Sequence, residues 1–365
     1  MPDVIILGGG IIGCATAYYL AKEGAGVMVL ERGEISCESS GAAAGMLAAL
    51  SDEGDRPPIF SQLCRDSLQM FDLLLPVLRK TGIDIRHRTI DILHVAVSST
   101  EVAALQELQQ KRGQDSAWLE PAEVRRLEPS LSSRAAGAMV TPDAQYVDPL
   151  RLTQAFAEAA RDQGATILEQ SPAVRLLKHG NRIRAVQTPV RTHEGDIVLL
   201  AGGPWTMALA GRLGAHVPTR PVRGQMLSLD TPPGGLNHMI WGSSAYLIPR
   251  EDNQTYVGAT VEEAGYRKRT TRAGLGSLRS GAASLVPYFR GANQRSAWAG
   301  LRPGSPDDLP IMGRLPGWQN VWVSTGHYRN GILLAPVAGR LMQQAMLSSD
   351  PDVLPAELSP SRFAE

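Results

Sequence analysis

The sequence predicts an α/β domain with a parallel sheet, interleaved along the chain with a second domain built on a mostly antiparallel β-sheet. Residues 4–7 and 27–30 are short all-apolar runs, typical of strands buried on both faces, and residues 13–23 between them have helical spacing. This β-α-β order makes the two strands parallel with a right-handed crossover. A strand-rich stretch over residues 222–260 predicts the antiparallel sheet.

The α/β pattern returns in the middle and at the end of the chain, so each domain should be discontinuous. Apolar strand candidates occur at 197–201 and 320–324, and residues 332–347 have the pattern of a last helix. We therefore expect a Rossmann-type domain made of residues 1–85, 145–220 and 301–365. The second domain, of α+β type, should comprise residues 86–144 and 221–300.

Shorter segments carry local signals. Asp148 followed by Pro149 predicts a capped helix that runs to about residue 162. Ser99 or Thr100 should cap another helix, which ends at Gly113. The other expected elements are a helix over 60–80, a strand over 89–97, a hairpin from 174–178 and 182–186, a loop over 301–313 and a loosely ordered tail after 351.

Bulk properties point to a small-molecule partner. The chain has 365 residues, and its Lys+Arg and Asp+Glu counts are both 36, so the formal net charge is +0. Such a chain has no global field that would recruit nucleic acid or an anionic membrane. No apolar run reaches the roughly 18 residues of a membrane span. Three widely separated cysteines make neither a disulfide framework nor a thiolate metal site, which predicts a cytoplasmic protein.

The residues from Gly8 to Gly13 contain the motif G-x-G-x-x-G between the first strand and the first helix. In this context Gly8 permits a tight turn, Gly10 lets the backbone approach a pyrophosphate, and Gly13 lets the helix pack on the strand. Glu31 follows Gly13 by 18 residues, near the spacing expected for an acid that binds a ribose diol. The alternative is a simple glycine-rich turn, but the context favours a dinucleotide site.

The kind of dinucleotide is a separate question. Arg32 would suit a 2′-phosphate, but Glu31 beside it would repel one, so NADP is disfavoured. Residues 39–46, Ser-Ser-Gly-Ala-Ala-Ala-Gly-Met, form a run of small side chains just past the second strand. Such a run suits close backbone contact with a long flat cofactor and favours FAD, although a flexible linker has a similar composition.

These residues, together with three further motifs, resemble the D-amino-acid oxidase superfamily, and most closely the glycine oxidases associated with thiamine synthesis. The resemblance extends over nearly the whole chain. The three motifs are Pro-Val-Arg-Gly-Gln at 221–225, Trp-Ala-Gly-Leu-Arg-Pro-Gly at 298–304 and Gly-His-Tyr-Arg-Asn-Gly-Ile-Leu-Leu-Ala-Pro at 326–336. The resemblance implies that the first domain binds FAD and the second binds substrate.

The resemblance also implies which positions hold the flavin, in addition to Gly8, Gly10 and Gly13. They are Ile11, Ile12, Glu31, Arg32, Ser39, Ser40, Ala44, Gly45, Met46, Val174, His327, Tyr328, Arg329, Asn330, Gly331, Ile332 and Leu333. The helix that follows Gly331 would point its positive end toward the flavin ring. Relatives that tether flavin through a cysteine carry it near Arg302, and residues 300–313 contain none, so the flavin should be non-covalent.

Three residues are candidates for substrate binding and catalysis. Arg302 is either a solvated surface charge or a planar fork for a carboxylate. The resemblance favours the fork, since the matching arginine binds the substrate α-carboxylate. Tyr246 matches a position whose hydroxyl points into the site, although a half-buried strand tyrosine is the alternative. Arg329 matches a position near both substrate and flavin. No histidine pair has metal-ligand spacing, so no metal is expected.

The implied activity is oxidative deamination of glycine, sarcosine or D-alanine to an imine and a 2-oxo acid, with hydrogen peroxide formed from O2. A hand-over of the imine to a thiazole synthase and a homo-oligomeric state are both compatible with it. Ser244 and Val261 depart from the histidine and methionine of some glycine oxidases, which leaves the preferred amino acid open. The rival interpretations are a dehydrogenase for D-proline, hydroxyproline or sarcosine with a quinone-type acceptor, and a non-enzymatic flavoprotein.

Overall fold

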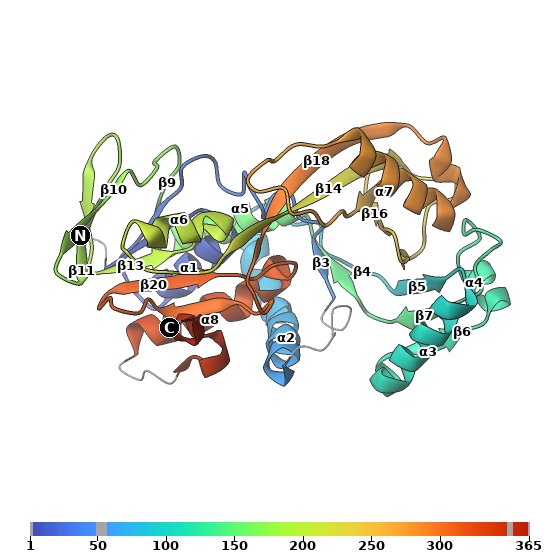
Figure 1. Ribbon diagram of the computed structural model, residues 1–365, viewed down its shortest axis with the longest axis horizontal. Helices are drawn as coiled ribbons and strands as arrows, with labels where there is room; N and C mark the ends of the chain where they lie inside the picture. The colour runs from blue at the N-terminus through green and yellow to red at the C-terminus, as the bar shows by residue number, and fades with distance from the viewer. Residues whose placement is uncertain (1–2, 49–56, 349–352, 364–365) are drawn as a thin grey trace. The chain divides into compact units, whose positions relative to one another are not determined.

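The computed structural model describes residues 3–48, 57–348 and 353–363. The chain forms two compact units (Figure 1). Unit 1 comprises Met1–Arg86, Val147–Val222 and Leu301–Glu365, and unit 2 comprises His87–Tyr146 and Arg223–Gly300. Both units are therefore discontinuous in sequence. The assignment of unit 1 to FAD and of unit 2 to substrate stays a prediction.

Unit 1 is built on a mainly parallel sheet with β1 near its centre. Val4 of β1 lies in register with Val27 on one side and with Ile197 on the other, and both pairings are parallel. The predicted β-α-β start is thus confirmed. The strands, in their order across the sheet, are β19 (Ile311–Arg314), β20 (Val321–Thr325), β13 (Ile197–Leu200), β1 (Val4–Leu7), β2 (Val27–Leu30) and β9 (Thr166–Leu168).

Most helices of unit 1 pack in one core on one face of this sheet, whereas the short α6 (Thr206–Gly211) contributes Ala210 to a second core on the opposite face. The close approach of two helices is visible at Gly339, where an added Cβ would lie 2.9 Å from the backbone carbon of Ala15. The predicted cap at Asp148 is confirmed, because its carboxylate accepts a hydrogen bond from Arg151 N at 3.1 Å. The helices are α1 (Ile11–Lys22), α2 (Pro58–Lys80), α5 (Pro149–Asp162), α6 (Thr206–Gly211) and α8 (Gly331–Leu347).

Helix α8 contains a proline in its interior. Pro336 has no N–H and leaves a gap in the helical hydrogen-bond ladder. Ser67 of α2 bonds to the backbone of α8 one residue after this gap. Its hydroxyl donates to Leu333 O at 2.6 Å and accepts from Val337 N at 3.2 Å, which are the two groups that a regular helix would pair with each other. A side chain from a neighbouring helix therefore bridges the helix next to its proline.

Unit 1 also carries the predicted hairpin and a short N-terminal strand, β3 (Met46–Leu47). The hairpin strands pair in antiparallel register from Arg175 with Gln187 to His179 with Arg182. The sheet that they form consists of β10 (Arg175–His179), β11 (Arg182–Gln187) and β12 (Thr192–Glu194).

Unit 2 is built on a mostly antiparallel sheet, in which β15 and β5 pair in parallel. One face packs on α7 through Leu227, Leu247, Val257 and Leu278, and Figure 1 shows α7 beside β14 and β16. Across the sheet the strands are β18 (Gln294–Gly304), β14 (Arg220–Asp230), β17 (Gln254–Gly258), β16 (Tyr246–Arg250), β15 (Met239–Trp241), β5 (Ile92–Ala96), β7 (Gly137–Thr141) and β6 (Ala117–Leu119). The strands β4 (Arg88–Thr89) and β8 (Gln145–Tyr146) pair separately.

The helices of unit 2 include two that the sequence pattern does not reveal. They are α4 (Pro121–Leu127) and α7 (Arg272–Leu285), alongside the expected α3 (Ser99–Arg112). Helix α7 contains three glycines, which disfavour helix in isolation, and it forms because its apolar side packs on the sheet. The expected cap of α3 is wrong by one residue. Ser98 has extended backbone and its hydroxyl accepts from Glu101 N at 3.3 Å, so Ser98 is the cap.

Two further expectations need correction. The expected loop over 301–313 is partly strand, because β18 continues to Gly304. Pro303 within it is tolerated because β18 is at the edge of its sheet. In the described part of the tail, Leu358 is fully buried and the guanidinium of Arg362 pairs with Asp307. This part is ordered and packed, whereas residues 349–352 and 364–365 lie outside the described residues.

Candidate cofactor and substrate site

The glycine loop between β1 and α1 has little room for side chains. Gly8 has a φ of +124°, and a Cβ there would lie 2.4 Å from Ala201 O. A Cβ on Gly13 would lie 2.0 Å from Gly8 O. Real Cβ atoms never approach a carbonyl oxygen so closely, so these two glycines are required by the turn and by the packing of α1 on β1.

At Gly10, in contrast, an added Cβ would lie close to a side chain and not to the backbone. Gly10 is the N-cap of α1, and the nearest atom to an added Cβ would be Ser40 Oγ at 3.2 Å. The hydroxyl of Ser40 accepts from Ile11 N at 2.9 Å. Ile12 is half-buried, and the first turn contains no acidic side chain. Ser40 thus occupies the first N–H of α1, and the positive end of the helix dipole, with no acidic side chain in the first turn, suits a phosphate.

Glu31 connects the end of β2 to this loop. Its carboxylate accepts from Gly9 N at 2.6 Å and from Gly33 N at 2.8 Å, and the residue is only 8% exposed. Each carboxylate oxygen can accept a second hydrogen bond, so the ribose role remains open to it. The structure thus gives Glu31 a task that sequence spacing does not show, namely holding the glycine loop in place.

Arg32 stacks on an indole ring. Its guanidinium carbon lies 3.9 Å from the ring centroid of Trp205, and its Nη2 donates to Glu38 at 2.9 Å. Trp205 and Glu38 were missed from the sequence. The available signal was that Trp205 closely follows β13, whose carboxyl end lies next to that of β1, where α/β sheets bind their ligands.

The small-residue run forms a series of turns after β2. A Cβ on Gly41 would lie 2.3 Å from Ser36 O, and Gly45 has a φ of +84°. Ala44 lies half-buried between them and Met46 opens β3. Gly41 and Gly45 are therefore required by the backbone conformation of these turns, and the run has a defined structure.

The strand that carries Arg302 is held on both sides by predicted flavin-binding segments. The carbonyl of Leu301 accepts from the Ser39 hydroxyl at 2.5 Å, and the carbonyl of Pro303 accepts from Tyr328 N at 3.0 Å. Arg302 itself is half-buried. The structure therefore brings together Arg302, the small-residue run and the segment before α8, which are far apart in sequence.

The segment before α8 has unusual backbone. Tyr328 has a φ of +47°, in the left-handed region that few non-glycine residues adopt. Its ring lies 5.2 Å from the guanidinium carbon of the exposed Arg329. Asn330 N donates to His327 O at 2.9 Å and closes the turn, after which Gly331 begins the helix. The next two predicted flavin residues, Ile332 and Leu333, are buried.

His327 carries an orphaned polar atom. The residue is 3% exposed, and its Nε2 has no hydrogen-bond partner among the described residues. Burial lowers the pKa of the ring to about 3, so the imidazole is neutral at physiological pH. An unsatisfied buried nitrogen costs about 1–3 kcal/mol. A ligand with a polar edge at the start of α8 would remove that cost.

These observations fit a bound FAD. The start of α1, which has no acidic first turn, suits its pyrophosphate, and Glu31 lies next to that loop. The orphaned His327 nitrogen precedes a second helix without an acidic first turn. Val174 is exposed, and its N–H donates to Gln187 O. The residues just before Val174 lie near Glu31, because Ser171 N donates a hydrogen bond to the backbone oxygen of Glu31 at 2.7 Å.

Tyr246, the third substrate candidate, belongs to unit 2. It opens β16 directly opposite Gly258, where an added Cβ would lie 2.4 Å from the tyrosine oxygen. Its ring centroid is 5.6 Å from that of Trp241. The phenol is therefore held against a position that must remain glycine. Ser244 and Val261, the two departures from the family pattern, are exposed residues of the same unit.

The geometry of Glu31 yields a testable prediction. Glu31→Ala removes both the ribose acceptor and the tie to Gly9, and charged hydrogen bonds of this kind contribute about 1.5–3 kcal/mol. The Kd for FAD should therefore rise about 10- to 150-fold, while turnover of the fully reconstituted enzyme changes little. Fluorescence titration of apoprotein with FAD measures the Kd. Glu34→Ala, an exposed carboxylate three residues away, is the matched control, and equal Kd values for the two variants would refute the assignment.

Comparison with known proteins agrees with this geometry. The family model described as FAD dependent oxidoreductase matches residues 3–345. A glycine oxidase of Bacillus licheniformis is 34% identical over 95% of this chain and 93% of its own length. A bifunctional ThiO/ThiG protein of Trichormus variabilis is 31% identical over 99% of this chain, which covers 55% of that longer protein.

Solved structures show the same relationship. The glycine oxidase of Geobacillus kaustophilus superposes with a TM-score of 0.92 at 30% identity, covering 100% of this chain and 99% of the other. Within the described residues, no helix is long and apolar enough to cross a membrane. The match to the family model spans both units and includes every segment that surrounds the proposed flavin site. The chain is a member of the FAD-dependent oxidoreductase family and is an FAD-dependent amine oxidoreductase.

Proposed function

We propose that this enzyme oxidises glycine or another small amino acid, such as sarcosine or D-alanine. The observation that carries the proposal is the placement of Arg302, on a strand whose carbonyls are bound by Ser39 and Tyr328. An arginine fixed between two flavin-binding segments can hold a carboxylate beside the cofactor. The similarity to glycine oxidases over nearly the full chain supports the same substrate class.

The reaction removes two hydrogens from the amino acid. When bound, FAD would supply the two-electron acceptor for the hydride equivalent from Cα, while a proton leaves the amine. The terminal oxidant is O2, which takes up two electrons and two protons and becomes hydrogen peroxide. For glycine the product is the imine, and water converts it to glyoxylate and ammonia. The atoms balance as glycine, O2 and H2O giving glyoxylate, ammonia and H2O2.

The contribution of the protein is mostly positioning and electrostatics. Arg302 binds the carboxylate through a planar pair of N–H donors, Arg329 adds a second positive charge, and Tyr246 offers a hydroxyl. The substrate must present a neutral amine, and no side-chain base is assigned. His327 is neutral, so it brings no charge to the start of α8, where the helix dipole favours negative charge on a ligand.

Two finer points belong to this proposal. The flavin is non-covalent, because residues 300–313 contain no cysteine to form a thioether. The imine is passed to a thiazole-forming enzyme in the cytoplasm. The bifunctional ThiO/ThiG relative supports this step, because it joins ThiO and ThiG in one chain. The principal alternative is a dehydrogenase of the same fold that passes its electrons to a quinone-type acceptor.

A substrate screen tests the proposal. Purified holoenzyme should form peroxide from at least one of glycine, sarcosine, D-alanine and D-proline under oxygen, with glycine or sarcosine among the best. Acid precipitation of the same preparation should release all of its flavin into the supernatant as FAD. Activity that appears only with an artificial electron acceptor would favour the dehydrogenase. Absence of any turnover with either acceptor would contradict amino-acid oxidation.

A further inference from the structure

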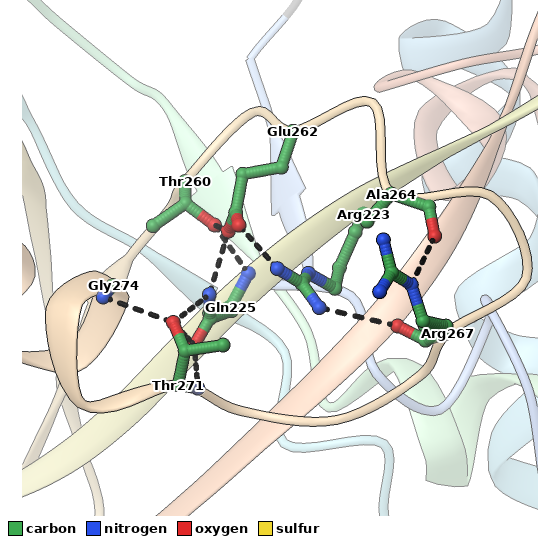
Figure 2. A network of polar contacts seen from close by, with 8 residues as sticks. All are labelled: Arg223, Gln225, Thr260, Glu262, Ala264, Arg267, Thr271 and Gly274. Carbon is green, nitrogen blue, oxygen red and sulfur yellow. Dashed lines mark hydrogen bonds and ion pairs between the residues drawn. The ribbon is translucent and has the colours of Figure 1, made fainter.

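A cluster of polar side chains in unit 2 lies outside the residues assigned so far. It consists of Arg223 and Gln225 on β14, Thr260 and Glu262 just after β17, and Thr271 at the start of α7 (Figure 2). We call it the Glu262 cluster. The pair formed by Arg223 and Glu262 is largely shielded from water, with side chains that are 9% and 29% exposed.

Glu262 is the centre of the cluster. Its carboxylate accepts from the Arg223 guanidinium, from Gln225 Nε2 at 2.6 Å and from the Thr260 hydroxyl. Its backbone also exchanges two hydrogen bonds with Arg223, of 2.9 and 3.0 Å. Burial opposes ionisation of Glu262, but hydrogen bonds from Arg223, Thr260 and Gln225 outweigh it and hold the pKa of the carboxyl below its usual range. The carboxylate therefore stays charged at neutral pH.

Gln225 joins the two ends of the loop over residues 263–270. Its Nε2 donates to Glu262 at one end, and its Oε1 accepts from Thr271 N at 2.7 Å at the other. A Cβ on Gly274 would collide with this amide, so the start of α7 packs directly on it. One side-chain amide therefore closes a compact loop, in the manner of an Ω-loop whose ends are close together.

The same contacts fix both neighbours of Val261. Thr260 Oγ1 accepts from Gln225 N at 2.9 Å on one side, and Glu262 is bound to Arg223 on the other. Val261 itself is 52% exposed. Its backbone is thus held on both sides while its side chain remains in contact with solvent.

The pairing register shows which way Val261 faces. Leu227 of β14 pairs with Val257 of β17, and Arg223 of β14 pairs with Glu262. These two pairs are four residues apart along β14 but five residues apart along the segment that begins in β17. This extra residue is a β-bulge, and it exchanges the two faces for the residues that follow. Glu262 therefore shares the face of Val257, which packs on α7, and Val261 lies on the opposite face.

The opposite face is the one that carries Tyr246. Tyr246 pairs directly with Gly258, and directly paired residues share a face of a sheet. Without the bulge, Val261 would have pointed toward α7 and Glu262 toward Tyr246. The bulge and the Glu262 cluster together put a short apolar side chain, in place of a carboxylate, on the face of the predicted substrate tyrosine.

We propose that Arg223, Gln225 and Glu262 are positioning residues for substrate selection, holding Val261 as a fixed wall that limits the size of the group on the substrate α-carbon. The inference rests on the proposed function, since it requires an amino-acid substrate near Tyr246. It attributes part of the substrate selectivity to Arg223, Gln225 and Glu262, which do not themselves contact the substrate. A side chain excludes a larger substrate only if it cannot move aside. A more mobile Val261 should therefore raise the activity toward the larger substrate relative to the smaller one.

The test compares two isosteric changes on the same segment. Glu262→Gln removes the charge that pairs with Arg223, and Glu263→Gln makes the same change at an exposed neighbour. In the Glu262→Gln holoenzyme, kcat/KM for D-alanine relative to glycine should rise about tenfold, the lower end of what one methyl group contributes to discrimination. The kcat for glycine should change less than twofold. Glu263→Gln should leave both quantities at wild-type values.

A double-mutant cycle separates positioning from general loosening. Val261→Ala alone should raise the same D-alanine to glycine ratio, but it should add little in the Glu262→Gln background, where the wall is already mobile. Thr260→Val, which keeps the side-chain shape and removes the hydroxyl, gives a milder variant if Glu262→Gln folds poorly. Trypsin supplies a readout without turnover, because residues 267–269 are Arg-Lys-Arg in the clamped loop. Cleavage there should be several-fold faster in Glu262→Gln than in Glu263→Gln.

The outcomes separate this inference from the proposed function. If the wild type oxidises no amino acid, the proposed function fails, and substrate selection by Val261 fails with it. If the wild type is active but Glu262→Gln and Thr260→Val keep the wild-type substrate ratio, only the positioning role is overturned. Additive effects of Val261→Ala and Glu262→Gln would likewise overturn it, and unchanged trypsin cleavage would show that the cluster does not clamp the loop.

Discussion

Replacing Arg302 by alanine should lower kcat/KM for glycine by about 30- to 5,000-fold and leave the FAD content unchanged. Truncating one partner of a buried ionic pair costs about 2–5 kcal/mol, and each ~1.4 kcal/mol is tenfold. The flavin should stay bound because the contacts from Ser39 and Tyr328 are made to backbone carbonyls beside Arg302, which the substitution retains. Steady-state kinetics and the flavin absorbance of the purified variant give the two quantities.

Arg302→Lys and a second substrate make the result specific. Lysine keeps the charge but loses the bidentate geometry, so the loss should be large but smaller than with alanine. Methylamine is glycine without its carboxylate. It should be a poor substrate of the wild type and nearly indifferent to both changes. If glycine and methylamine lost activity equally, Arg302 would serve the flavin or the fold, and the carboxylate site would have to be sought at Arg329.

Gly13→Ala should yield a protein that retains little FAD and unfolds at a clearly lower temperature. The new Cβ would lie 2.0 Å from Gly8 O, a backbone atom that cannot swing aside as a flexible side chain would. Relief requires α1 to move off β1, which disturbs the glycine loop and its bond to Glu31. Overpacking costs about 1–3 kcal/mol and sometimes more. Thermal unfolding followed by circular dichroism, with and without added FAD, measures the effect.

Gly211→Ala is the matched control for this change. Gly211 ends α6 in the same unit, with no atom within 4 Å of an added Cβ and no left-handed φ. Alanine there should be neutral or slightly stabilising, by up to about 1 kcal/mol, because it restricts the unfolded chain. A Gly13→Ala protein with the Tm and the FAD affinity of the wild type would show that the helix and strand are not in contact at this point.

The features that sequence predicted well are those that neighbouring residues determine. Apolar runs determine β1 and β2, the glycine spacing determines the turn into α1, and the Asp148–Pro149 pair caps α5 through its own side chain. Each requires fewer than about forty consecutive residues, so a pattern in one window is sufficient. The resemblance to glycine oxidases, which is confirmed, rested on short motifs of the same kind.

The features that sequence missed depend on contacts between distant segments. Helix α7 is stabilised by the sheet beneath it, and the edge position of β18 allows strand to continue through Pro303. Trp205 stacks with Arg32, which lies more than 170 residues before it in the chain. The hydroxyl of Ser67 pairs with α8, about 270 residues away in the chain. None of these partners can be identified from composition or periodicity, since each is chosen by the packing of the whole unit.

The interleaved sequence of the two units has a consequence for how the chain reaches its native state. Val4 of β1 needs Val27 on one side and Ile197 on the other, and β13 in turn needs β20, where Val198 pairs with Val321. Such pairings give a high contact order, and long-range parallel pairing is slow to form. During synthesis on the ribosome, unit 1 cannot complete its sheet until nearly the whole chain has emerged. Until then β13 lacks β20 and one edge of the sheet stays unpaired, and this is the stage at which the nascent protein depends most on protection from aggregation.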